Sequence, residues 1–278
     1  MKIIDLIKKK KTISFEFFPP KRESDLPKLY ETVDRLSTYN PDFVSFTYGA
    51  GGNTRQLTIK VSKDTKIANL TQVMTHLTCV AHTKKEIDTI LDELSKYKIE
   101  NIIALRGDKP KDIDIKNELI HATDLISYIK NQSNSFCIAA ACYPELHPET
   151  NDFSEEIKYT KLKQDKGADF LVTQLFFDNK DYFKFVDESL NKGITIPIIP
   201  GILPIVSTSQ IRRITKLCGS KIPNNLNIKL EKYKDNNLET AKLGIEYATK
   251  QVLELIENDV PGIHFYSLNK TKSVGHFL

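Results

Sequence analysis

The sequence predicts an α/β fold: a single (β/α)8 TIM barrel over residues 1–278, with a short N-terminal helix before the first strand. Three observations lead to this prediction. Eight short apolar segments recur about every thirty residues, helical patterns fill the stretches between them, and no low-complexity linker divides the chain. A doubly wound sheet is the competing architecture, but it usually has fewer strands and would need a domain break.

The first strand, residues 13–18, ends before two consecutive prolines, because proline cannot continue a β-ladder. Strand alternation places Glu16 near its carboxyl end, on the face opposite two phenylalanines. A carboxylate among aromatic residues should have a raised pKa, which suits a general acid. The alternative is a structural glutamate that pairs with Lys21 or Arg22. Both interpretations remain open from this stretch alone.

The remaining strands are near-continuous apolar runs, as expected when both faces of a parallel sheet are buried. Apolar residues three and four positions apart predict the helices between them. Ser24 is the expected N-cap of the helix after the first strand, and Ser207 begins the helix after the seventh. Residues 219–235 are polar and irregular, with short helical pieces. Strands are expected at 43–47, 73–80, 101–105, 136–142, 170–176, 196–199 and 263–268, and the other helices at 54–69, 84–97, within 116–131, 153–166, around 182–186 and 238–255.

Composition argues against several classes of function. Forty basic and thirty-six acidic residues give a net charge of +4, too small and too dispersed to indicate nucleic-acid binding. No stretch approaches the ~20 apolar residues of a membrane span. The basic run 8–11 follows the apolar patch 3–7, the reverse of a signal peptide, and is interpreted as the solvated end of the N-terminal helix. We therefore expect a cytoplasmic protein.

The cysteines support the same compartment. The four of them show no paired spacing, which suits free thiols in a reducing cytoplasm. His76, Cys79 and His82 have the spacing of a metal site, but on a strand His76 and Cys79 point to opposite faces. No metal site is expected.

Polar residues cluster where the predicted strands end. In a (β/α)8 barrel these ends meet at one rim, where the chemistry takes place. Any one of these residues has a structural explanation, but together they predict a single concave, polar site. The rim residues are Glu16, Thr47, Tyr48, Gly49, His76, Arg106, Gly107, Asp108, Tyr143, His147, Gln174, Asn269 and Lys270.

The same segments resemble the 5,10-methylenetetrahydrofolate reductases, specifically the bacterial type that contains FAD. The resemblance covers nearly the whole chain in the family's order and is highly specific as a set. The segments that carry it are SFEFFPPK at 14–21, TYGA at 47–50, HLTC at 76–79, ALRGD at 104–108, YPELHPE at 143–149, TQLFFD at 173–178, IPGILP at 199–204 and FYSLN at 265–269.

The resemblance implies an enzyme that takes hydride from NADH or NADPH onto non-covalent FAD and passes it to methylenetetrahydrofolate. The product is 5-methyltetrahydrofolate, which feeds methionine synthesis. The family's barrel binds FAD without a Rossmann domain, consistent with the lack of a Gly-x-Gly-x-x-Gly motif here. The resemblance also implies a homo-oligomer, often a tetramer. The regulatory domain of the eukaryotic enzymes is not expected, since the sequence ends just after the barrel.

By the same resemblance, Glu16 is the general acid that protonates N10 of the folate. Gln174, Gln210 and Lys270 match substrate-binding positions. Arg106 is expected to neutralise the FAD pyrophosphate together with a lysine of the same group. The family's FAD-contacting positions correspond to Thr47, Tyr48, Ala50, His76, Arg106, Gly107, Asp108, Ala122, Tyr143, His147 and Lys163.

Three positions depart from the family pattern. Lys270 stands where bacterial relatives usually carry Arg, which keeps the charge but loses the two-pronged grip on a carboxylate. Glu156 stands where Asp is more common, and Ile214 replaces an aromatic residue that packs on substrate in some relatives. Two other functions remain as alternatives. A Schiff-base aldolase would need a strand lysine facing the barrel mouth, which the predicted strands lack, and a non-enzymatic ligand-binding barrel is the third class.

Overall fold

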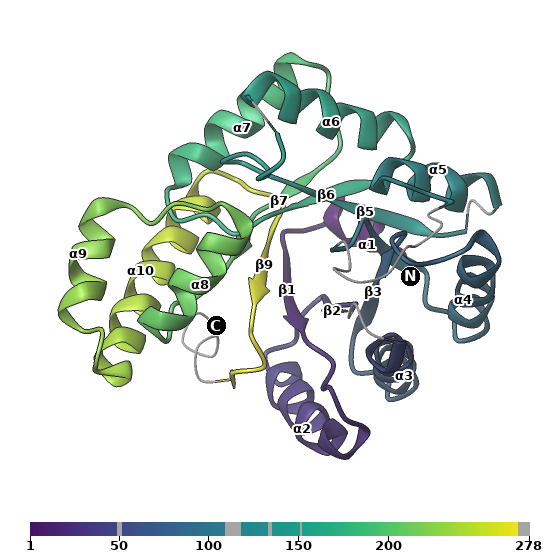
Figure 1. Cartoon of the computed structure of the whole chain (residues 1–278), viewed down its shortest axis with the longest axis horizontal. Coiled ribbons are helices and arrows are strands. Elements are labelled where there is room, and N and C mark those ends of the chain that lie inside the picture. The colour runs from purple at the N-terminus through teal and green to yellow at the C-terminus, as the bar shows by residue number, and fades with distance from the viewer. Residues whose placement is uncertain (49–51, 109–117, 133–134, 151, 272–278) are drawn as a thin grey trace.

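The computed structural model describes residues 1–48, 52–108, 118–132, 135–150 and 152–271. Strands and helices alternate along these residues, and every strand pair is parallel (Figure 1). The predicted (β/α)8 barrel is therefore confirmed. Its strands are β1 (Thr12–Phe17), β2 (Phe43–Phe46), β3 (Gln72–Thr78), β4 (Asn101–Leu105), β5 (Cys137–Cys142), β6 (Phe170–Thr173), β7 (Ile198–Ile199), β8 (Gly201–Ile202) and β9 (Gly262–Tyr266).

The ring closes through its seventh strand. The sheet order is β7-β6-β5-β4-β3-β2-β1-β9-β8, and only Pro200 separates β7 from β8. Proline has no N–H to donate, so the ladder is interrupted there, while the Pro200 carbonyl accepts from the His264 N–H at 3.0 Å. A Cβ on Gly201 would lie 2.4 Å from the Thr173 carbonyl oxygen, so glycine allows β8 to pass this close to β6.

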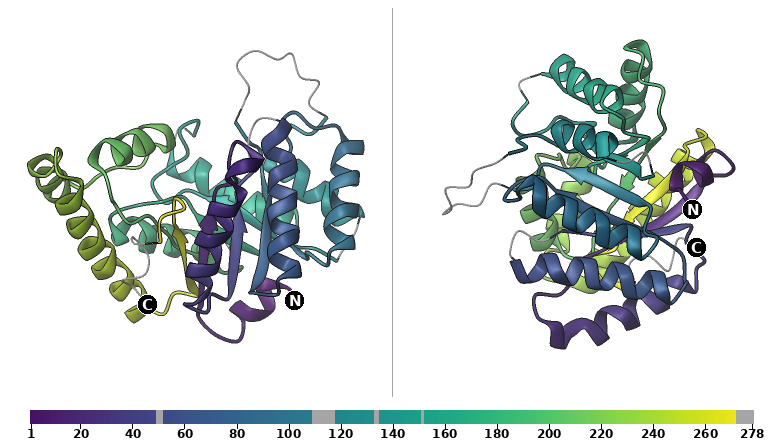
Figure 2. Two further views of the ribbon diagram at one scale, coloured as in Figure 1. Left: turned by 90° about the horizontal axis from the view of Figure 1, so that it is seen from below. Right: turned by 90° about the vertical axis from the view of Figure 1, so that its right-hand side faces the viewer.

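Helices surround the sheet, with α8, α9 and α10 lying together on one side (Figures 1 and 2). None of the helices in the described ranges combines the length and hydrophobicity needed to cross a bilayer. The helices are α1 (Ile3–Ile7), α2 (Leu26–Ser37), α3 (Gly52–Ile67), α4 (Lys84–Lys96), α5 (Ala122–Gln132), α6 (Phe153–Asp165), α7 (Asn179–Asn191), α8 (Thr208–Cys218), α9 (Asn224–Lys232) and α10 (Asn237–Glu257), with a 3-10 turn η1 (Glu23–Asp25) before α2.

Three sequence predictions need correction. Ser24 is not the N-cap of α2, because η1 occupies residues 23–25 and Asp25 is the cap residue. The strand expected at 170–176 ends at Thr173, and the strand expected at 196–199 continues past Pro200 as two short pieces. Residues 219–235, expected to hold short helical pieces, contain the nine-residue helix α9, whose Leu226 and Leu230 are buried.

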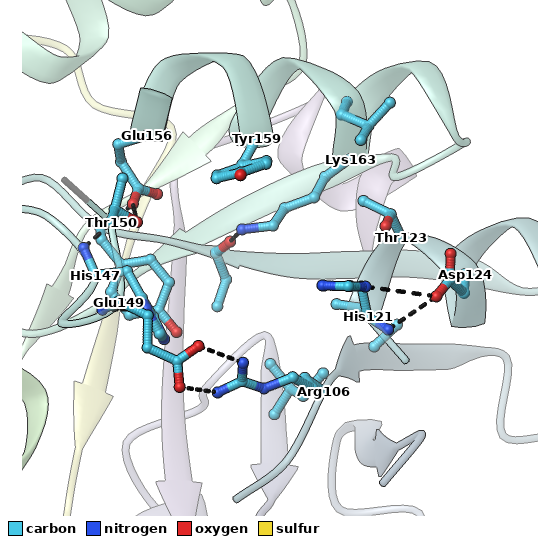
Figure 3. A pocket seen from close by; sticks show the side chains of 16 residues that line it. Arg106, His121, Thr123, Asp124, His147, Glu149, Thr150, Glu156, Tyr159 and Lys163 are labelled. Carbon is cyan, nitrogen blue, oxygen red and sulfur yellow. Dashed lines mark hydrogen bonds and ion pairs between the residues drawn. The ribbon is translucent and has the colours of Figure 1, made fainter. Parts of the chain in front are cut away.

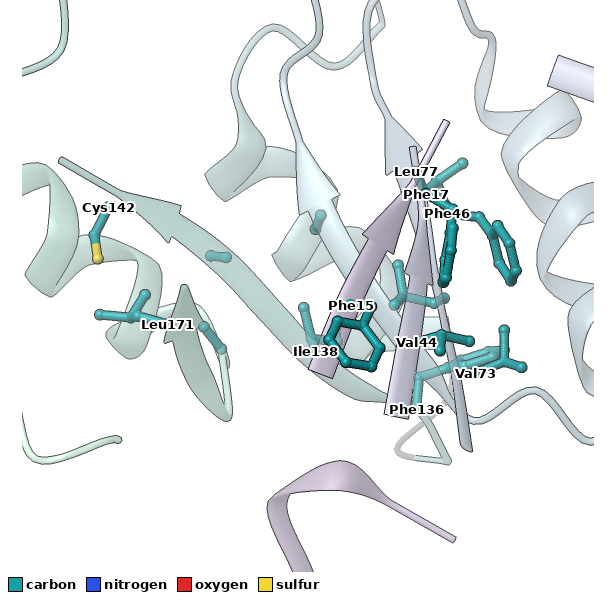
Figure 4. Packing of buried hydrophobic residues seen from close by; sticks show 14 of the residues in the cluster. Phe15, Phe17, Val44, Phe46, Val73, Leu77, Phe136, Ile138, Cys142 and Leu171 are labelled. Atoms are coloured by element: carbon teal, nitrogen blue, oxygen red, sulfur yellow. The ribbon is translucent and has the colours of Figure 1, made fainter. Parts of the chain in front are cut away.

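The alternation of β1 separates two layers. Phe15 and Phe17 point outward into the cluster between sheet and helices, shown with their neighbours in Figure 4. Ser14 and Glu16 lie on the opposite face, toward the inside of the barrel. The predicted face assignment of this strand is therefore confirmed, and it places the carboxyl group of Glu16 inside the ring.

Helix α1 fills the amino-terminal end of the barrel. Ile3 and Ile7 are buried in the inner cluster against residues such as Phe43 and Phe170. The Ile3 N–H donates to Asn101 Oδ1 at 2.7 Å, which fixes the helix to β4. Each such apolar side chain contributes about 1.5–3 kcal/mol when fully buried. With this end filled, the interior is approached from the carboxyl ends of the strands.

Candidate active site

Glu16 is the second-to-last residue of β1, which ends shortly before Pro19 and Pro20. The residue is 7% exposed, and in the sheet it lies opposite Ser45 of β2 and Tyr266 of β9. The Ser267 hydroxyl donates to the Glu16 carbonyl at 2.5 Å, which holds the strand end in place. Its carboxyl group therefore lies just inside the rim of the barrel.

Two imidazoles face this carboxylate. Glu16 Oε2 lies 3.3 Å from Nε2 of His76 on β3 and 3.7 Å from Nε2 of His264 on β9. His76 is 6% exposed and His264 is 1% exposed, so the carboxylate and the two imidazoles are almost fully shielded from solvent. In such surroundings charged partners interact more strongly than they would in water.

These imidazoles reverse the predicted pKa shift of Glu16. Burial raises the pKa of the carboxyl, as the sequence suggested, but the contacts with His264 and His76 outweigh it and lower the pKa from 4.5 to about 2. The raised pKa expected of a lone carboxylate is therefore wrong, because this carboxylate is not alone. The structural alternative, a pair of Glu16 with Lys21 or Arg22, is not found either: the ion-pair partners of Glu16 are the two imidazoles, and Arg22 Nε bonds Asp25 at 3.3 Å.

His264 is the functional residue that sequence reasoning missed. It lies in the predicted last strand, two residues before Tyr266, and so on the inward face. This two-residue spacing from Tyr266 was the only feature of the sequence that placed His264 inside the barrel. The neighbouring strand β1 lies about 250 positions away in the sequence, and only the β1–β9 pairing brings Ser14 opposite His264.

A cavity of about 550 Å³ opens between the ends of β4 and β5 and the helices α5 and α6 (Figure 3). Five of the predicted cofactor residues line it, namely Arg106, Ala122, Tyr143, His147 and Lys163. The volume lies within the range of about 300–1,000 Å³ that is usual for small-molecule sites. Five of the residues predicted to contact the cofactor therefore lie around one cavity.

The cavity contains two cations with different partners. Arg106 forms a two-pronged ion pair with Glu149, at 2.5 Å from Nη1 and 2.9 Å from Nη2. Lys163 Nζ donates to the Ala141 carbonyl at 2.8 Å and lies 5.6 Å from the centre of the Tyr143 ring. Burial lowers the pKa of Lys163. Glu149 is a second residue that the sequence did not single out.

Aromatic rings and a buried carboxylate form the opposite wall of the cavity. The Tyr143 and His147 rings meet edge to face with centres 4.7 Å apart, and burial raises the pKa of Tyr143 and lowers that of His147. Glu156 is 1% exposed and accepts hydrogen bonds from the His147 N–H at 3.2 Å and the Thr150 hydroxyl at 3.1 Å. This departure from the family pattern supports the YPELHPE loop. Cations, ring faces and hydrogen-bonding groups together suit a nucleotide with its phosphates.

Other predicted cofactor residues lie along the neighbouring rim. Thr47 follows β2, and its N–H donates to the Phe17 carbonyl at 2.9 Å. The Tyr48 hydroxyl lies 3.0 Å from His82 Nε2. Gly107 has a φ of 86°, a left-handed conformation that favours glycine, and Asp108 beside it is exposed. Ala50 lies outside the described residues.

The predicted substrate residues fall into two places. Gln210 and Lys270 line a second cavity of about 560 Å³ at the start of α8, and Lys270 Nζ lies 3.2 Å from Gln210 Oε1. Gln174 is at the end of β6, where its N–H donates to the Cys142 carbonyl at 2.7 Å. Ile214 packs against the apolar cluster beneath α8 and α9. Across the described ranges, no group of three or more His, Cys, Asp or Glu side chains is placed to hold a metal ion.

The chain is similar to known proteins over nearly its whole length. In Salmonella typhimurium, 5,10-methylenetetrahydrofolate reductase is 38% identical over 261 residues, 94% of this chain and 87% of that protein. In Arabidopsis thaliana, methylenetetrahydrofolate reductase (NADH) 1 is 36% identical over 98% of this chain, which spans about half (49%) of the plant protein.

A solved structure also has the same fold. It is an uncharacterized protein from Clostridium thermocellum, described as binding two copies of 5-methyl-5,6,7,8-tetrahydrofolic acid, with a TM-score of 0.65 at 15% identity. The structural match covers 96% of this chain and 93% of the Clostridium chain. The family model for methylenetetrahydrofolate reductase matches residues 2–278. The chain therefore belongs to the methylenetetrahydrofolate reductase family.

Proposed function

We propose that this chain reduces 5,10-methylenetetrahydrofolate to 5-methyltetrahydrofolate, with FAD bound non-covalently and NADH or NADPH as hydride donor. One observation carries the proposal: the same barrel has a buried carboxylate–imidazole group inside its strands and, where β4 and β5 end, a cavity lined by cations and aromatic rings. Membership of the family and the folate that the Clostridium protein is described as binding support the same substrate. The plant relative's name supports NADH as a donor.

The residues of the first cavity fit FAD. Arg106 and Lys163 would neutralise the pyrophosphate, and Tyr143 and His147 would contact the rings. Thr47, Tyr48, Ala50, His76, Gly107, Asp108 and Ala122 would complete the site. When bound, FAD accepts hydride from the nicotinamide and gives it to the folate, so the two substrates react in turn.

Glu16 would supply the proton that the folate step requires. Opening the five-membered ring breaks the bond between the methylene carbon and N10, and the electron pair goes to N10 with the proton from Glu16. The methylene carbon is left as an iminium cation on N5, which then accepts hydride. Asp108 can stabilise that positive charge. One proton and one hydride are therefore consumed in each turnover.

Three residues would hold the substrate. The amides of Gln174 and Gln210 can pair with the donor and acceptor edges of a pterin or a nicotinamide. Lys270, in the second cavity, would contact the carboxylate of the folate glutamate. A ring held by such an amide can be exchanged for the other ring, consistent with alternating half-reactions.

The wider setting follows the family resemblance. We propose that the product feeds methionine synthesis in the cytoplasm and that the chain forms a homo-oligomer, with a tetramer as the expected state. The described free cysteines, three of them buried, support a reducing compartment. Size-exclusion chromatography with light scattering would measure the subunit count.

The proposed function is tested with purified full-length chain. Its absorbance spectrum should show bound flavin, NADH or NADPH should bleach that absorbance without oxygen, and methylenetetrahydrofolate should restore it with formation of 5-methyltetrahydrofolate. A chain that binds no FAD when FAD is added, or whose bleached flavin is not restored by the folate, contradicts the proposal.

One observation favours a Schiff-base aldolase as a second candidate. Lys163 has a buried amine with a lowered pKa, which is the property that such a lysine needs. Against it, Lys163 stands on α6 and its amine is bonded to Ala141, whereas no strand in the described part of the chain contains a lysine. Borohydride trapping with carbonyl compounds distinguishes the two, since an aldolase would retain a covalent adduct at Lys163.

A further inference from the structure

A column of polar groups runs inside the barrel below Glu16. His264 is 1% exposed, and its two ring nitrogens have different partners. Nδ1 lies 2.8 Å from the hydroxyl of Ser14, whereas Nε2 lies 3.4 Å from the hydroxyl of Ser45 and 3.7 Å from Glu16 Oε2. The ring is held by Phe43, stacked at 5.9 Å, and by Tyr266, edge-on at 5.5 Å. Its orientation toward the carboxylate is therefore fixed by packing.

Ser14 can accommodate either state of Nδ1. Its hydroxyl lies 2.8 Å from Nδ1 and 3.3 Å from the Ile263 carbonyl, so it can donate to Nδ1, or accept from an Nδ1–H while it donates to the carbonyl. In both arrangements a proton on Nε2 points toward the carboxylate oxygen of Glu16, where two facing lone pairs would repel each other. The geometry therefore favours a proton on Nε2.

Few other ionisable groups face this pair. Glu16 comes from β1, His76 faces the same carboxylate from β3, and Tyr266 lies on the strand of His264 itself. Strand β2 contributes the Ser45 hydroxyl and the Phe43 ring, and β8 pairs with His264 through its backbone. The carboxylate and the two imidazoles therefore form the ionisable unit.

We propose that His264 is a positioning residue that stores the proton which Glu16 delivers to the folate. The proposal rests on the proposed function and adds a residue to it. A carboxylate held ionised by its neighbours cannot act as an acid unless a neighbour returns a proton to it. His264 lies opposite Ser14 in the β1–β9 register, two residues before Glu16, and so on the side of Glu16 away from the strand ends.

The proton balance is simple. The proton on His264 Nε2 moves to Glu16 Oε2, and Glu16 passes it to N10 as the bond from N10 to the methylene carbon breaks. This leaves an ionised Glu16 carboxylate and a neutral imidazole. Water restores the imidazole proton when the product leaves, so each turnover takes one proton from solvent.

The first experiment measures the carboxyl group directly. In the infrared spectrum of the full-length chain, the Glu16 band is assigned by subtracting the spectrum of Glu16→Gln, and its conversion to the protonated form is followed against pH. His264→Gln should move this conversion to higher pH, because a lowering contact is lost. His82→Gln is the matched control: His82 is also a buried rim histidine, but it contacts Tyr48 rather than a carboxylate. An unchanged Glu16 titration in His264→Gln would overturn the proposal.

The second experiment measures the two half-reactions against pH by stopped flow. As pH rises, the rate of the folate step should begin to fall at a lower pH in His264→Gln than in the wild type. Above that pH, each pH unit by which the fall is displaced lowers the rate about tenfold. The NAD(P)H step should keep its rate, because it needs no proton donor. Ser14→Ala, which removes only the Nδ1 support, should give a smaller displacement and serves if His264→Gln does not fold.

The outcomes separate the inference from the function on which it rests. A wild-type chain without a folate step contradicts the proposed function. A wild-type folate step whose pH dependence is unchanged in both His264→Gln and Ser14→Ala contradicts only the role of His264. A loss of flavin binding and of both half-reactions together, with the same pH profile, would make His264 a packing residue.

Discussion

Replacing Glu16 with Gln should stop the folate step and leave the reduction of FAD by NAD(P)H intact. The amide has almost the shape of the carboxyl group and can remain between the two imidazoles, but it has no acidic proton to give to N10. Hydride transfer from nicotinamide to flavin needs close stacking and no acid. The substitution therefore separates two reactions that take place at one site.

The expected loss can be worked out from the role assigned to Glu16. General acid catalysis typically contributes about 10²–10⁴-fold, equivalent to about 3–5 kcal/mol of barrier. In the proposed mechanism the proton reaches N10 through the Glu16 carboxyl, and His264 acts only through Glu16. Without that carboxyl the folate step should therefore slow by the full range. The NAD(P)H step should change by less than about threefold.

Anaerobic stopped-flow absorbance reports both steps on the same flavin band. The control is Glu145→Gln, because Glu145 is the rival acid on the rim. Burial raises its pKa to about 7, and its Oε1 accepts from the Lys221 N–H at 3.0 Å. If Glu145→Gln lost the folate step and Glu16→Gln kept it, the acid would be Glu145 and the reasoning about β1 would be refuted. If both steps fell together in Glu16→Gln, Glu16 would be a binding residue.

Three further predictions concern binding and stability. Arg106→Ala or Lys163→Ala should weaken FAD retention. Glu149→Gln should strengthen FAD retention by about 10-fold, because the charge-assisted pair between Arg106 and Glu149, worth ~1.5–3 kcal/mol, no longer competes with FAD for the guanidinium. Equilibrium dialysis checks both, and equal retention in all variants would remove these residues from the site. Lys270→Arg should preserve turnover and lower the KM for methylenetetrahydrofolate, because a guanidinium grips a carboxylate with two bonds; a clear rise in KM would show that the pocket is adapted to Lys. The pKa of Glu16, lowered from 4.5 to about 2, contributes stability that is present above pH 4.5 and lost as pH falls toward 2, about 3 kcal/mol in all. Urea unfolding over this pH range should show that loss in the wild type and not in Glu16→Gln, and parallel curves would contradict it.

The barrel was predictable because its signals are local. Each strand is a short apolar run, and each amphipathic helix follows the spacing of its own residues. What failed depended on neighbours distant in sequence. The seventh strand runs on past Pro200 because β6 and β9 pair with its two halves.

The candidate site was predictable to a similar degree. Strand ends mark the rim, so Arg106, Tyr143 and His147 could be placed around one cavity without knowing which groups they contact. The partner of Arg106 could not be predicted, because Glu149 lies at the end of a different loop and faces Arg106 only once that loop is folded. The sequence predicts which residues reach the rim, and folding decides which of them are already paired.

The reversed pKa shift of Glu16 shows why direction is harder to predict than location. From the strand alone, only burial could be estimated, and burial favours the neutral acid. The opposing contribution comes from His76, 60 residues away, and from His264, brought beside β1 by the pairing that closes the barrel. Since both contributions act on the same proton, neither residue type nor burial fixes the sign. An acid with so low a pKa can work near neutral pH only if its proton is kept on a neighbour, which is the role that we propose for His264.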